Sequence, residues 1–517
     1  MQLLSIIAVV VALFALASLA AVYSYGRFAR QARGEPSSAL PIAERDTLLD
    51  RIVSPKLKEY PDKSGLLLVT SNLQAFAIRA LAARSAERSL DLQYYYWKDD
   101  LTGGLLAREL IAAADRGVRV RVLLDDINTK GDDSTYLALD NHPNVEIRLF
   151  NPSRSRTSAL RRGIEMALRA FSVTRRMHNK AWIADGRMAI VGGRNIGDAY
   201  FDAAEMSNFH DMDLVLIGPA VQQAETVFDD YWNSSVVLPI SSLWRFRKGD
   251  LRKKRAYLEA LVSSDGARPY LRRLQAENST GSLLSGKQTI HWTAGARIVS
   301  DPAEKAVSAA SENWLLNTIF PVINAATSEL HIISPYFIPG AQGVVALQKL
   351  AAAGTEVSVL TNSLAATDVV AVHGAYANYR LALLAAGVSL YELRPEIIRQ
   401  GVSLFGSSGA SLHTKAFTVD GKSGFIGSFN FDSRSISLNT EMGVLFDDPG
   451  LTTEVNGVFA DQISPESSYR VMPRTGNVVW QDGTGASARI LDSEPAASIW
   501  RRITAVVIGL LPIESQL

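Results

Sequence analysis

The chain has 517 residues, 47% of them hydrophobic, and its 53 lysines and arginines nearly balance its 52 aspartates and glutamates. This composition is that of a folded protein with a sizeable core and excludes an intrinsically disordered chain. The absence of cysteine excludes disulfides and thiolate metal sites. The length exceeds that of one ordinary domain, so we expect two domains with additional segments.

Residues 1–26 contain no charged side chain, and Leu3 to Val22 are nearly all Leu, Ile, Val and Ala. Twenty helical residues span about 30 Å, the thickness of a bilayer core. Arg27, Arg30 and Arg33 follow the apolar run and no basic residue precedes it, which favours an uncleaved anchor over a secretory signal. The positive-inside rule then places the folded part on the cytoplasmic side. A signal cleaved at the alanine-rich end of the run is the alternative.

The remainder contains a repeated order of elements. In the first copy, helical patterns at 72–88 and 104–114 alternate with strand patterns at 90–97, 118–126 and 145–152. The second copy repeats this order with helices at 311–327 and 368–386 and with strands at 330–340, 356–363 and 388–395. Such alternation predicts α/β domains with a mixed sheet flanked by helices. The expected boundaries are a linker (27–55), a first domain (56–240), a basic inter-domain segment (241–295), a second domain (296–460) and a C-terminal tail (461–517).

Each copy contains one motif of the form His-x-Lys-x4-Asp, followed six residues later by a small-residue segment and an asparagine. The chain reads MHNKAWIADGRMAIVGGRN in the first copy and LHTKAFTVDGKSGFIGSFN in the second. The shared positions are His178, Lys180, Asp185, Gly193 and Asn195, and then His413, Lys415, Asp420, Ser428 and Asn430. Agreement at this many positions within a repeated domain indicates one composite site rather than two chance matches.

The motif spacing predicts a β-hairpin. Residues i and i+2 of a strand project from the same face, so each histidine lies beside its lysine. Asp-Gly is a strong hairpin turn signal, and the returning strand brings the small residues and the asparagine back beside the His-Lys pair. Small residues allow backbone N–H groups to approach a phosphate closely.

Two such sets suit phosphodiester chemistry. A neutral imidazole can attack phosphorus and form a phosphohistidine, while the second imidazole transfers protons to and from the alcohols. The two lysines counter the charge on the phosphoryl oxygens, as a metal does elsewhere. This chemistry requires no metal or other cofactor, and we expect none.

With these motifs the chain resembles the phospholipase D superfamily. The surroundings of the motifs (QYYYWKDD, RRMHNK, VGGRNIGDAYF, HTKAF, GSFNFDSRS and NTEMG) resemble the type C members of the bacterial cardiolipin synthase branch. The resemblance implies two duplicated domains related by pseudo-twofold symmetry. It also implies that His178 and His413 act as nucleophile and general acid/base, the first being favoured as nucleophile, and that the lysines and asparagines bind phosphate.

The resemblance further implies an acid that orients each imidazole. Glu441, in NTEMG, fits this role, and its counterpart in the first half is either Asp211 or Asp213. Asp185 and Asp420, although part of the motif, are expected to act mainly by holding the turn. Gly193 stands where the second copy has Ser428, so one side lacks a hydroxyl donor.

Three features favour lipid over nucleic acid as the partner. They are the N-terminal apolar segment, the basic and partly apolar stretch before His178, and the C-terminal stretch Ile499–Ile513, which has the pattern of an interfacial helix. Residues 151–180 carry eight basic side chains against one acid. A nucleic-acid binder more often interleaves such residues with exposed aromatic ones, so no nucleic acid is expected.

These observations predict an enzyme anchored in the bacterial inner membrane. It would transfer a phosphatidyl group to phosphatidylglycerol through a phosphohistidine, and the type C resemblance implies phosphatidylethanolamine as a further donor. A hydrolytic phospholipase D is the first alternative, and a phospholipase D-family nuclease is the second. A non-enzymatic membrane scaffold would predict loss of a histidine or lysine from one motif, and none is lost.

Overall fold

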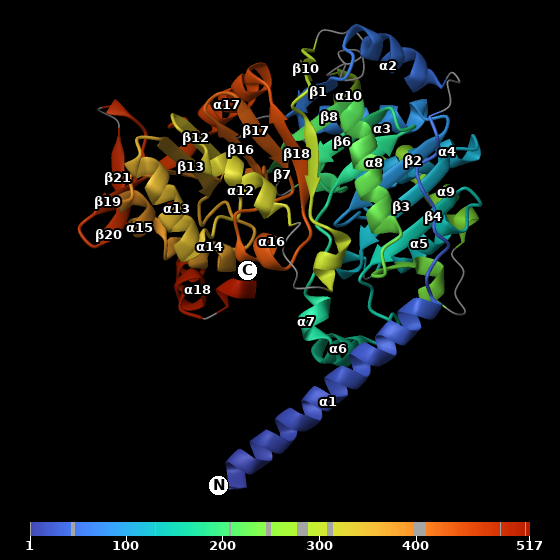
Figure 1. Ribbon diagram of the computed structural model, residues 1–517, viewed down its shortest axis with the longest axis horizontal. Coiled ribbons are helices and arrows are strands. Elements are labelled where there is room, and N and C mark those ends of the chain that lie inside the picture. The colour runs from blue at the N-terminus through green and yellow to red at the C-terminus, as the bar shows by residue number, and fades with distance from the viewer. Residues whose placement is uncertain are drawn as a thin grey trace.

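The computed structural model describes residues 2–42, 47–129, 131–205, 208–244, 250–276, 288–307, 314–395, 410–485, 488–511 and 513–516. Over these residues the chain forms two α/β domains side by side, and helix α1 projects from the first of them (Figure 1). Each domain is built on one mixed β-sheet, which confirms the fold class and the duplication that the repeat predicts.

The sheet of the first domain has nine strands in the order β10-β1-β8-β6-β5-β2-β3-β4-β9. Strands β2, β3 and β4 run parallel to one another, and the other neighbours pair antiparallel. The strands are β1 (Ser64–Val69), β2 (Ser89–Tyr94), β3 (Arg119–Asp125), β4 (Val145–Phe150), β5 (Ala181–Ala184), β6 (Met188–Gly192), β8 (Asp213–Ile217), β9 (Val237–Pro239) and β10 (His291–Thr293).

The outer face of this sheet is covered by helices α3 (Asn72–Ser85), α4 (Leu101–Asp115), α5 (Asp133–Asp140), α9 (Leu251–Val262) and α10 (Ala267–Ala276). Successive side chains of β3 point to opposite faces of the sheet, so only alternate ones contact these helices. Val122 and Leu124 belong to the core under these helices, whereas Leu123 faces the other domain.

The second sheet has ten strands in the order β11-β18-β17-β16-β12-β13-β14-β19-β20-β21. Its central six strands repeat the order β8-β6-β5-β2-β3-β4 of the first sheet. The strands are β11 (Arg297–Ser300), β12 (Glu329–Ile333), β13 (Glu356–Asn362), β14 (Ser389–Leu393), β16 (Ala416–Val419), β17 (Ser423–Gly427), β18 (Met442–Asp447), β19 (Ser468–Arg474), β20 (Asn477–Asp482) and β21 (Arg489–Leu491). The helices are α12 (Leu316–Asn324), α13 (Gly340–Ala352), α14 (Val370–Ala377), α15 (Arg380–Ala385), α16 (Ser433–Ser437) and α17 (Pro449–Gln462).

The inner faces of the two sheets share one hydrophobic core. Helix α8 (Pro219–Trp232) of the first domain and α17 of the second contribute to it, for example through Phe228 and Phe459. Two further contacts join the domains beside this core. Strand β15 (Ala410–Leu412) pairs in parallel with β7 (Asn208–His210), and Met177 bridges to Thr440. Both contacts immediately precede a motif histidine or an acid expected to orient one.

The predicted hairpins are present, with β5–β6 turning at Asp185–Gly186 and β16–β17 at Asp420–Gly421. Asp185 and Asp420 have φ angles of 53° and 52°, a left-handed conformation that Asp tolerates better than most residues. Within the expected linker (27–55), helix α2 (Leu48–Glu59) begins, and within the expected tail, β19–β21 extend the second sheet. Parts of the predicted segments, namely 245–249, 277–287 and 311–313, lie outside the described residues.

Two helices expose apolar faces. The part of α1 (Gln2–Gln31) from Leu4 onward is long and apolar enough to cross a membrane, and it is exposed along its apolar length. Helix α18 (Ile499–Gly509) packs on α14 through Ala505, while Trp500 and Val506 on its other side are 74% and 65% exposed. Figure 1 shows α18 on the side of the molecule from which α1 projects.

Candidate active site

His178 lies just before β5 and is held by the second domain. Its backbone N–H donates to the carbonyl of Thr440 at 2.8 Å. Its ring Nδ1 lies 2.8 Å from Oε2 of Glu441 and 3.1 Å from the backbone oxygen of Ser428. With Nδ1 turned to these acceptors, the other ring nitrogen is directed away from them and is available for chemistry.

His413 lies just after β15 and is held by the first domain in the same way. Its backbone N–H donates to the carbonyl of His210 at 2.8 Å, and its Nδ1 lies 2.6 Å from Oδ2 of Asp211. Asp213 is instead paired with Arg79 at 2.9 Å and with Arg194 at 3.2 Å. Of the two acids that the sequence left open, the structure therefore brings Asp211 to the imidazole.

The two histidine–acid pairs are reciprocal, because each joins a histidine of one domain to a carboxylate of the other. The acids occupy corresponding places, since Asp211 precedes Met212 and Glu441 precedes Met442. The carbonyls of these two methionines accept from the N–H groups of Gly193 and Ser428, at 3.2 Å and 2.9 Å. Neither domain alone contains a complete pair, so the site exists only where the domains dock.

The two motif lysines are buried beside the histidines. Lys180 donates to the carbonyl of His178 at 2.6 Å, and Lys415 donates to the carbonyl of His413 and lies 3.1 Å from its Nδ1. Burial lowers the pKa of Lys180 well below its ordinary value, although Glu441 opposes this. Burial also lowers the pKa of Lys415 to about 8. An incoming phosphate would favour the charged forms of both.

The imidazoles are poised to be neutral. Burial lowers the pKa of His178 to about 4 despite the opposing effect of Glu441, and burial with Lys415 and Lys180 lowers the pKa of His413 well below its ordinary value. Burial raises the pKa of Glu441, but its contacts with His178, Lys180 and Ser428 outweigh this, so the pKa lies below its ordinary value. Glu441 is therefore charged at neutral pH and acts as the acceptor.

The expected phosphate-binding residues line the same place. The Asn195 amide donates to the hydroxyl of Tyr200 at 3.0 Å, and the Ser428 hydroxyl donates to Glu441. The side-chain oxygen of Asn430 is buried without a hydrogen-bond partner among the described residues, which leaves it free to accept from a substrate group.

The glycine of the first motif has a steric reason. A Cβ at Gly193 would lie 2.2 Å from Oδ1 of Asp211, a separation that no side chain allows. In the second half the longer Glu441 leaves room for the side chain of Ser428, whose hydroxyl then bonds to that carboxylate. Position 193 therefore has no hydroxyl because the shorter Asp211 brings its carboxylate into the space that a side chain there would occupy.

The motif aspartates lie at the other ends of their strands, away from the histidines. Asp185 accepts from the backbone N–H groups of Arg88 and Ser89 at 2.7 Å and 2.9 Å. Asp420 accepts from the N–H groups of Ser328 and Glu329 at 2.7 Å and 3.1 Å. These bonds tie each turn to the start of the adjoining central strand. They agree with the expectation that both aspartates stabilise the turns and do not contact a reacting group.

Aromatic residues that the sequence reading did not single out complete the site. The ring of Tyr95 lies edge-on to that of His178, with centroids 5.1 Å apart. The ring of Tyr200 lies 5.1 Å from that of His413, and its hydroxyl is 3.4 Å from Nε2. Their only sequence signal is position, because Tyr95 directly follows the central strand β2 and Tyr200 follows Asn195 by five residues.

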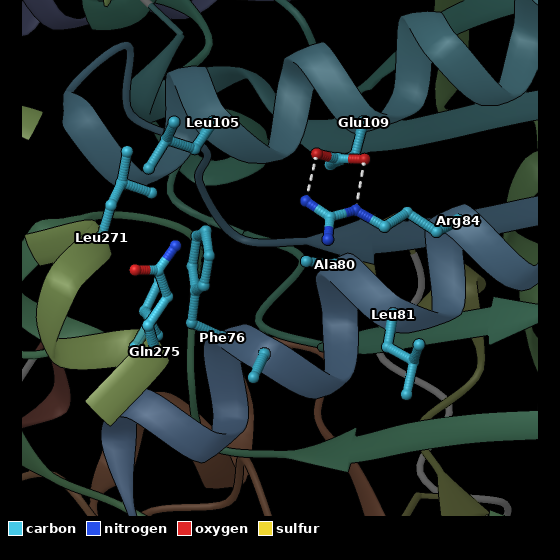
Figure 2. A pocket seen from close by; sticks show the side chains of 10 residues that line it. Phe76, Ala80, Leu81, Arg84, Leu105, Glu109, Leu271 and Gln275 are labelled. Atoms are coloured by element: carbon cyan, nitrogen blue, oxygen red, sulfur yellow. Dashed lines mark hydrogen bonds and ion pairs between the residues drawn. The ribbon is translucent and has the colours of Figure 1, made fainter. Parts of the chain in front are cut away.

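Two further features of the described chain involve none of the motif residues. A cavity of about 400 Å³ between α3, α4 and α10 is lined by apolar groups such as Phe76 and by the ion pair Arg84–Glu109 (Figure 2). His373, Glu392 and Glu494 have the spacing of a metal site. The guanidinium of Arg380 already lies among these three side chains, so it occupies the place of a cation.

Comparison with known proteins places the chain in one family. A family model described as "Cardiolipin synthase, PLD-like domain" matches residues 81–232 and 319–463, once in each domain. Cardiolipin synthase C of Escherichia coli strain K12 is 39% identical over 467 residues, covering 89% of this chain and 98% of its own length. Cardiolipin synthase 1 of Bacillus anthracis is 25% identical, covering 79% of this chain and 69% of its own length. The crystal structure of phosphatidylserine synthase from Haemophilus influenzae superposes with a TM-score of 0.55 at 13% identity, covering 81% of this chain and 91% of its own, a likeness of fold.

The duplicated fold with one His-Lys motif per half thus defines an enzyme of the phospholipase D superfamily. Within that class, the chain belongs to the cardiolipin synthase family. It is accordingly a phosphatidyltransferase that acts on phospholipids, and its N-terminal apolar helix agrees with membrane association.

Proposed function

We propose that this enzyme forms cardiolipin by transferring a phosphatidyl group to phosphatidylglycerol through a covalent phosphohistidine. The observation that carries the proposal is the reciprocal pairing of His178 with Glu441 and of His413 with Asp211 across the domain interface. Two oriented imidazoles on opposite sides of one site suit a two-step displacement, in which one is the nucleophile and the other transfers protons.

In the first step, Nε2 of His178 attacks phosphorus and the bond from phosphorus to the leaving headgroup oxygen breaks. The negative charge of the bound phosphate favours the protonated form of His413, which gives its proton to that oxygen. In the second step, neutral His413 takes the proton of a phosphatidylglycerol hydroxyl, whose oxygen attacks phosphorus and releases His178. Lys180 and Lys415 neutralise the charge on the phosphoryl oxygens throughout.

The surroundings of Nε2 support His178 as the nucleophile. Both imidazoles have a lowered pKa and both engage an acid through Nδ1, so the two histidines differ at the other ring nitrogen. In His413 both ring nitrogens have a neighbour, Asp211 at Nδ1 and the hydroxyl of Tyr200 at Nε2. An imidazole held at both nitrogens is better suited to relay a proton than to attack.

An exposed carboxylate near the site supports phosphatidylethanolamine as a donor. Asp368 accepts from the hydroxyl of Tyr336 at 2.8 Å, and its charge acts on His413, Lys415 and Tyr96. A carboxylate among tyrosine rings attracts an ammonium group. Asp368→Asn is expected to reduce use of phosphatidylethanolamine and to leave use of phosphatidylglycerol as donor nearly unchanged.

We further propose that α1 anchors the enzyme in the bacterial inner membrane with both domains on the cytoplasmic side. Arg27, Arg30 and Arg33 at the end of the apolar helix support this orientation. The apolar side chains that α18 exposes, among them Trp500, support its contact with the same surface.

The test is to incubate purified full-length protein with phosphatidylglycerol liposomes, with and without phosphatidylethanolamine, and to analyse the lipid products. We expect cardiolipin, and we expect none from His178→Ala or His413→Ala. Phosphatidic acid as the sole product would indicate a hydrolytic phospholipase D instead. DNA cleavage without any lipid turnover would indicate a nuclease.

A further inference from the structure

A cleft of about 740 Å³ lies where α1 meets the first domain. Phe28 of α1 forms one wall, and Trp244 forms another. Arg154 and Arg161 line the cleft from the segment that leads into α6 (Ala159–Leu168) and from α6 itself. None of the motif residues lines it, so the cleft is separate from the paired histidines.

The cleft has a fixed position relative to α1. The hydroxyl of Tyr25 donates to the carbonyl of Pro152 at 2.7 Å, and the guanidinium of Arg169 lies 3.3 Å from the centre of the Tyr25 ring. Arg154 lies 4.7 Å from the centre of the Phe28 ring. These contacts fasten the C-terminal end of α1 to the residues around the cleft.

This position corresponds to the headgroup level of a membrane. The apolar run of α1 ends at Val22, and Tyr25 and Arg27 follow as in an interfacial belt. Beside the cleft, Leu160 and Ile164 of α6 are 74% and 52% exposed. If α1 spans the bilayer, the cleft opens where lipid headgroups lie, and these apolar side chains meet the upper part of the acyl chains.

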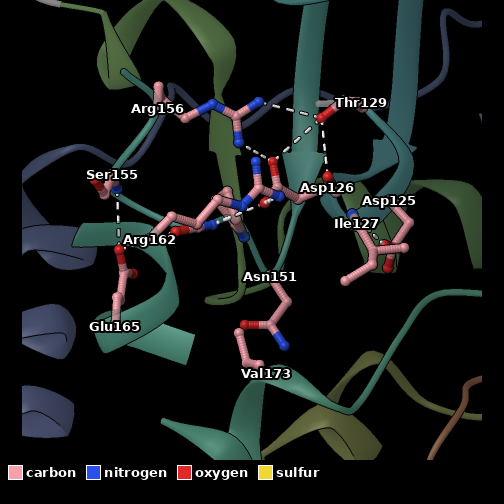
Figure 3. A network of polar contacts seen from close by, with 12 residues as sticks. Asp125, Asp126, Ile127, Thr129, Asn151, Ser155, Arg156, Arg162, Glu165 and Val173 are labelled. Carbon is pink, nitrogen blue, oxygen red and sulfur yellow. Dashed lines mark hydrogen bonds and ion pairs between the residues drawn. The ribbon is translucent and has the colours of Figure 1, made fainter. Parts of the chain in front are cut away.

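The acids around the cleft are already engaged by the protein (Figure 3). Arg156 is paired with Asp126 (Figure 3). Arg156 is also paired with Asp133. Glu165 accepts from the N–H groups of Arg154 and Ser155, each at 2.9 Å, and from Arg169 at 2.8 Å. The guanidinium groups of Arg154 and Arg161, by contrast, have no acidic partner among the described residues. The cleft therefore presents two uncompensated positive charges.

We propose that this cleft binds the phosphate headgroup of an anionic phospholipid, at a site distinct from the one where the reaction occurs. The phosphate would lie between Arg154 and Arg161, and the acyl chains would follow α1 past Leu160 and Ile164. This inference rests on the proposed membrane anchoring by α1 but not on the proposed reaction. Basic side chains at headgroup level attract anionic lipids, and the planar guanidinium group can bind a phosphate through two hydrogen bonds.

The cleft is also connected, through Asp126 and Asp125, to the segment that leads into His178. Asp126, which holds Arg156 and Arg162, directly follows Asp125, and Asp125 accepts from the N–H of Met177 at 2.8 Å. Met177 precedes His178. A lipid bound in the cleft would thus stabilise the segment from which the first motif begins.

The test counts lipids retained by the full-length protein in detergent micelles, using native mass spectrometry during titration with dioleoylphosphatidylglycerol. The background is His178→Ala, so that no lipid is consumed. We expect this protein to retain two molecules, one in each site, and expect Arg154→Gln/Arg161→Gln to retain one. The affinity of the lost site should fall about ten- to thirtyfold, as expected for two basic residues near an anionic headgroup.

Three comparisons make the result decisive. Arg268→Gln/Arg272→Gln removes the same charge from exposed positions on α10, which Figure 1 shows at the end of the domain away from α1, and it should retain both lipids. Arg154→Lys/Arg161→Lys should retain most of the binding and guards against a folding defect. Phosphatidylcholine should not replace the second phosphatidylglycerol.

Equal retention by the Arg154→Gln/Arg161→Gln protein and its background would overturn the proposal. Full displacement of the lipid by excess inorganic phosphate would overturn the assignment to a lipid and indicate a site for a soluble anion. Because the background is inactive, either outcome leaves the proposed reaction standing. Conversely, absence of cardiolipin synthesis by the wild type would not alter the lipid count.

Discussion

The inter-domain acids provide the sharpest mutational test of the site. Glu441→Gln keeps the shape of the side chain but removes the charge opposite Nδ1 of His178. Glu441 is fully buried and lies 2.8 Å from the ring, so no solvent replaces the lost charge when the imidazole carries a phosphoryl group. An uncompensated buried charge costs about 3–5 kcal/mol. In a transition state this corresponds to a loss in kcat of roughly 10²- to 10⁴-fold.

The assay is steady-state formation of cardiolipin in mixed micelles, with kcat and KM determined separately. We expect Glu441→Gln and Asp211→Asn to lower kcat and to change KM little, because neither acid is directed at the lipid. Asp213→Asn is the matched control, since Asp213 pairs with Arg79 and Arg194 and not with a histidine. It should lower the unfolding temperature while the folded protein keeps most of its kcat. A Glu441→Gln enzyme within threefold of the wild-type kcat would refute the assigned role.

Three further predictions concern the lysines, the turns and the close packing of the site. In the proposed mechanism Lys415 acts in its charged form, and burial lowers its pKa to about 8, so kcat/KM should fall as pH rises above about 8; a pH–rate profile that stays flat well above this value would contradict the proposed role. Burial raises the pKa of Asp420, but the backbone N–H groups and hydroxyls that donate to its carboxylate outweigh this and hold the pKa below its ordinary value. The carboxylate therefore stabilises the folded state at pH values above its pKa in the unfolded chain. This contribution is lost as the pH falls through its pKa in the folded protein. Asp420→Asn should lower the free energy of unfolding by about 1–3 kcal/mol in urea titrations at pH 7, and an unchanged midpoint would rule this out. Gly193→Ala should displace Asp211 from His413 and reduce kcat at least tenfold, whereas Ser428→Ala, which removes only a hydroxyl, should be milder; equal activities would argue against the steric account.

The sequence predicts well the features that depend on a short stretch of residues and that occur in both copies of the repeat. The spacing of His178, Lys180 and Asp185 recurs at His413, and Asp-Gly encodes a hairpin wherever it joins two apolar strands. Comparing two copies of one pattern separates the constrained positions from the variable ones. This is why the duplicated α/β fold and both hairpins could be predicted, and why the motif histidines and lysines could be named as candidates for the reacting side chains.

What remained open depends on docking of the domains. Asp211 and Asp213 are two residues apart and equally plausible by type, and only the pairing of β7 with β15 brings Asp211 to His413. Tyr95 and Tyr200 are ordinary aromatic residues in the sequence and reach the imidazoles through tertiary packing. Strands β20 and β21 extend the second sheet beyond β19, which takes the place of β9, so no second copy marked these two strands as part of the sheet.

The central claim is that phosphatidyl transfer passes through a covalent bond to one histidine of a composite site. The most direct measurement is a rapid denaturing quench at mildly alkaline pH, where the P–N bond of a phosphohistidine survives, during turnover of phosphatidylglycerol. Mass spectrometry of the peptides follows. We expect a phosphatidyl adduct on the peptide that contains His178. In the Glu441→Gln protein we expect this adduct to be absent although the protein remains folded. Continued cardiolipin synthesis with no adduct on either motif peptide, or an adduct confined to the peptide of His413, would contradict this expectation.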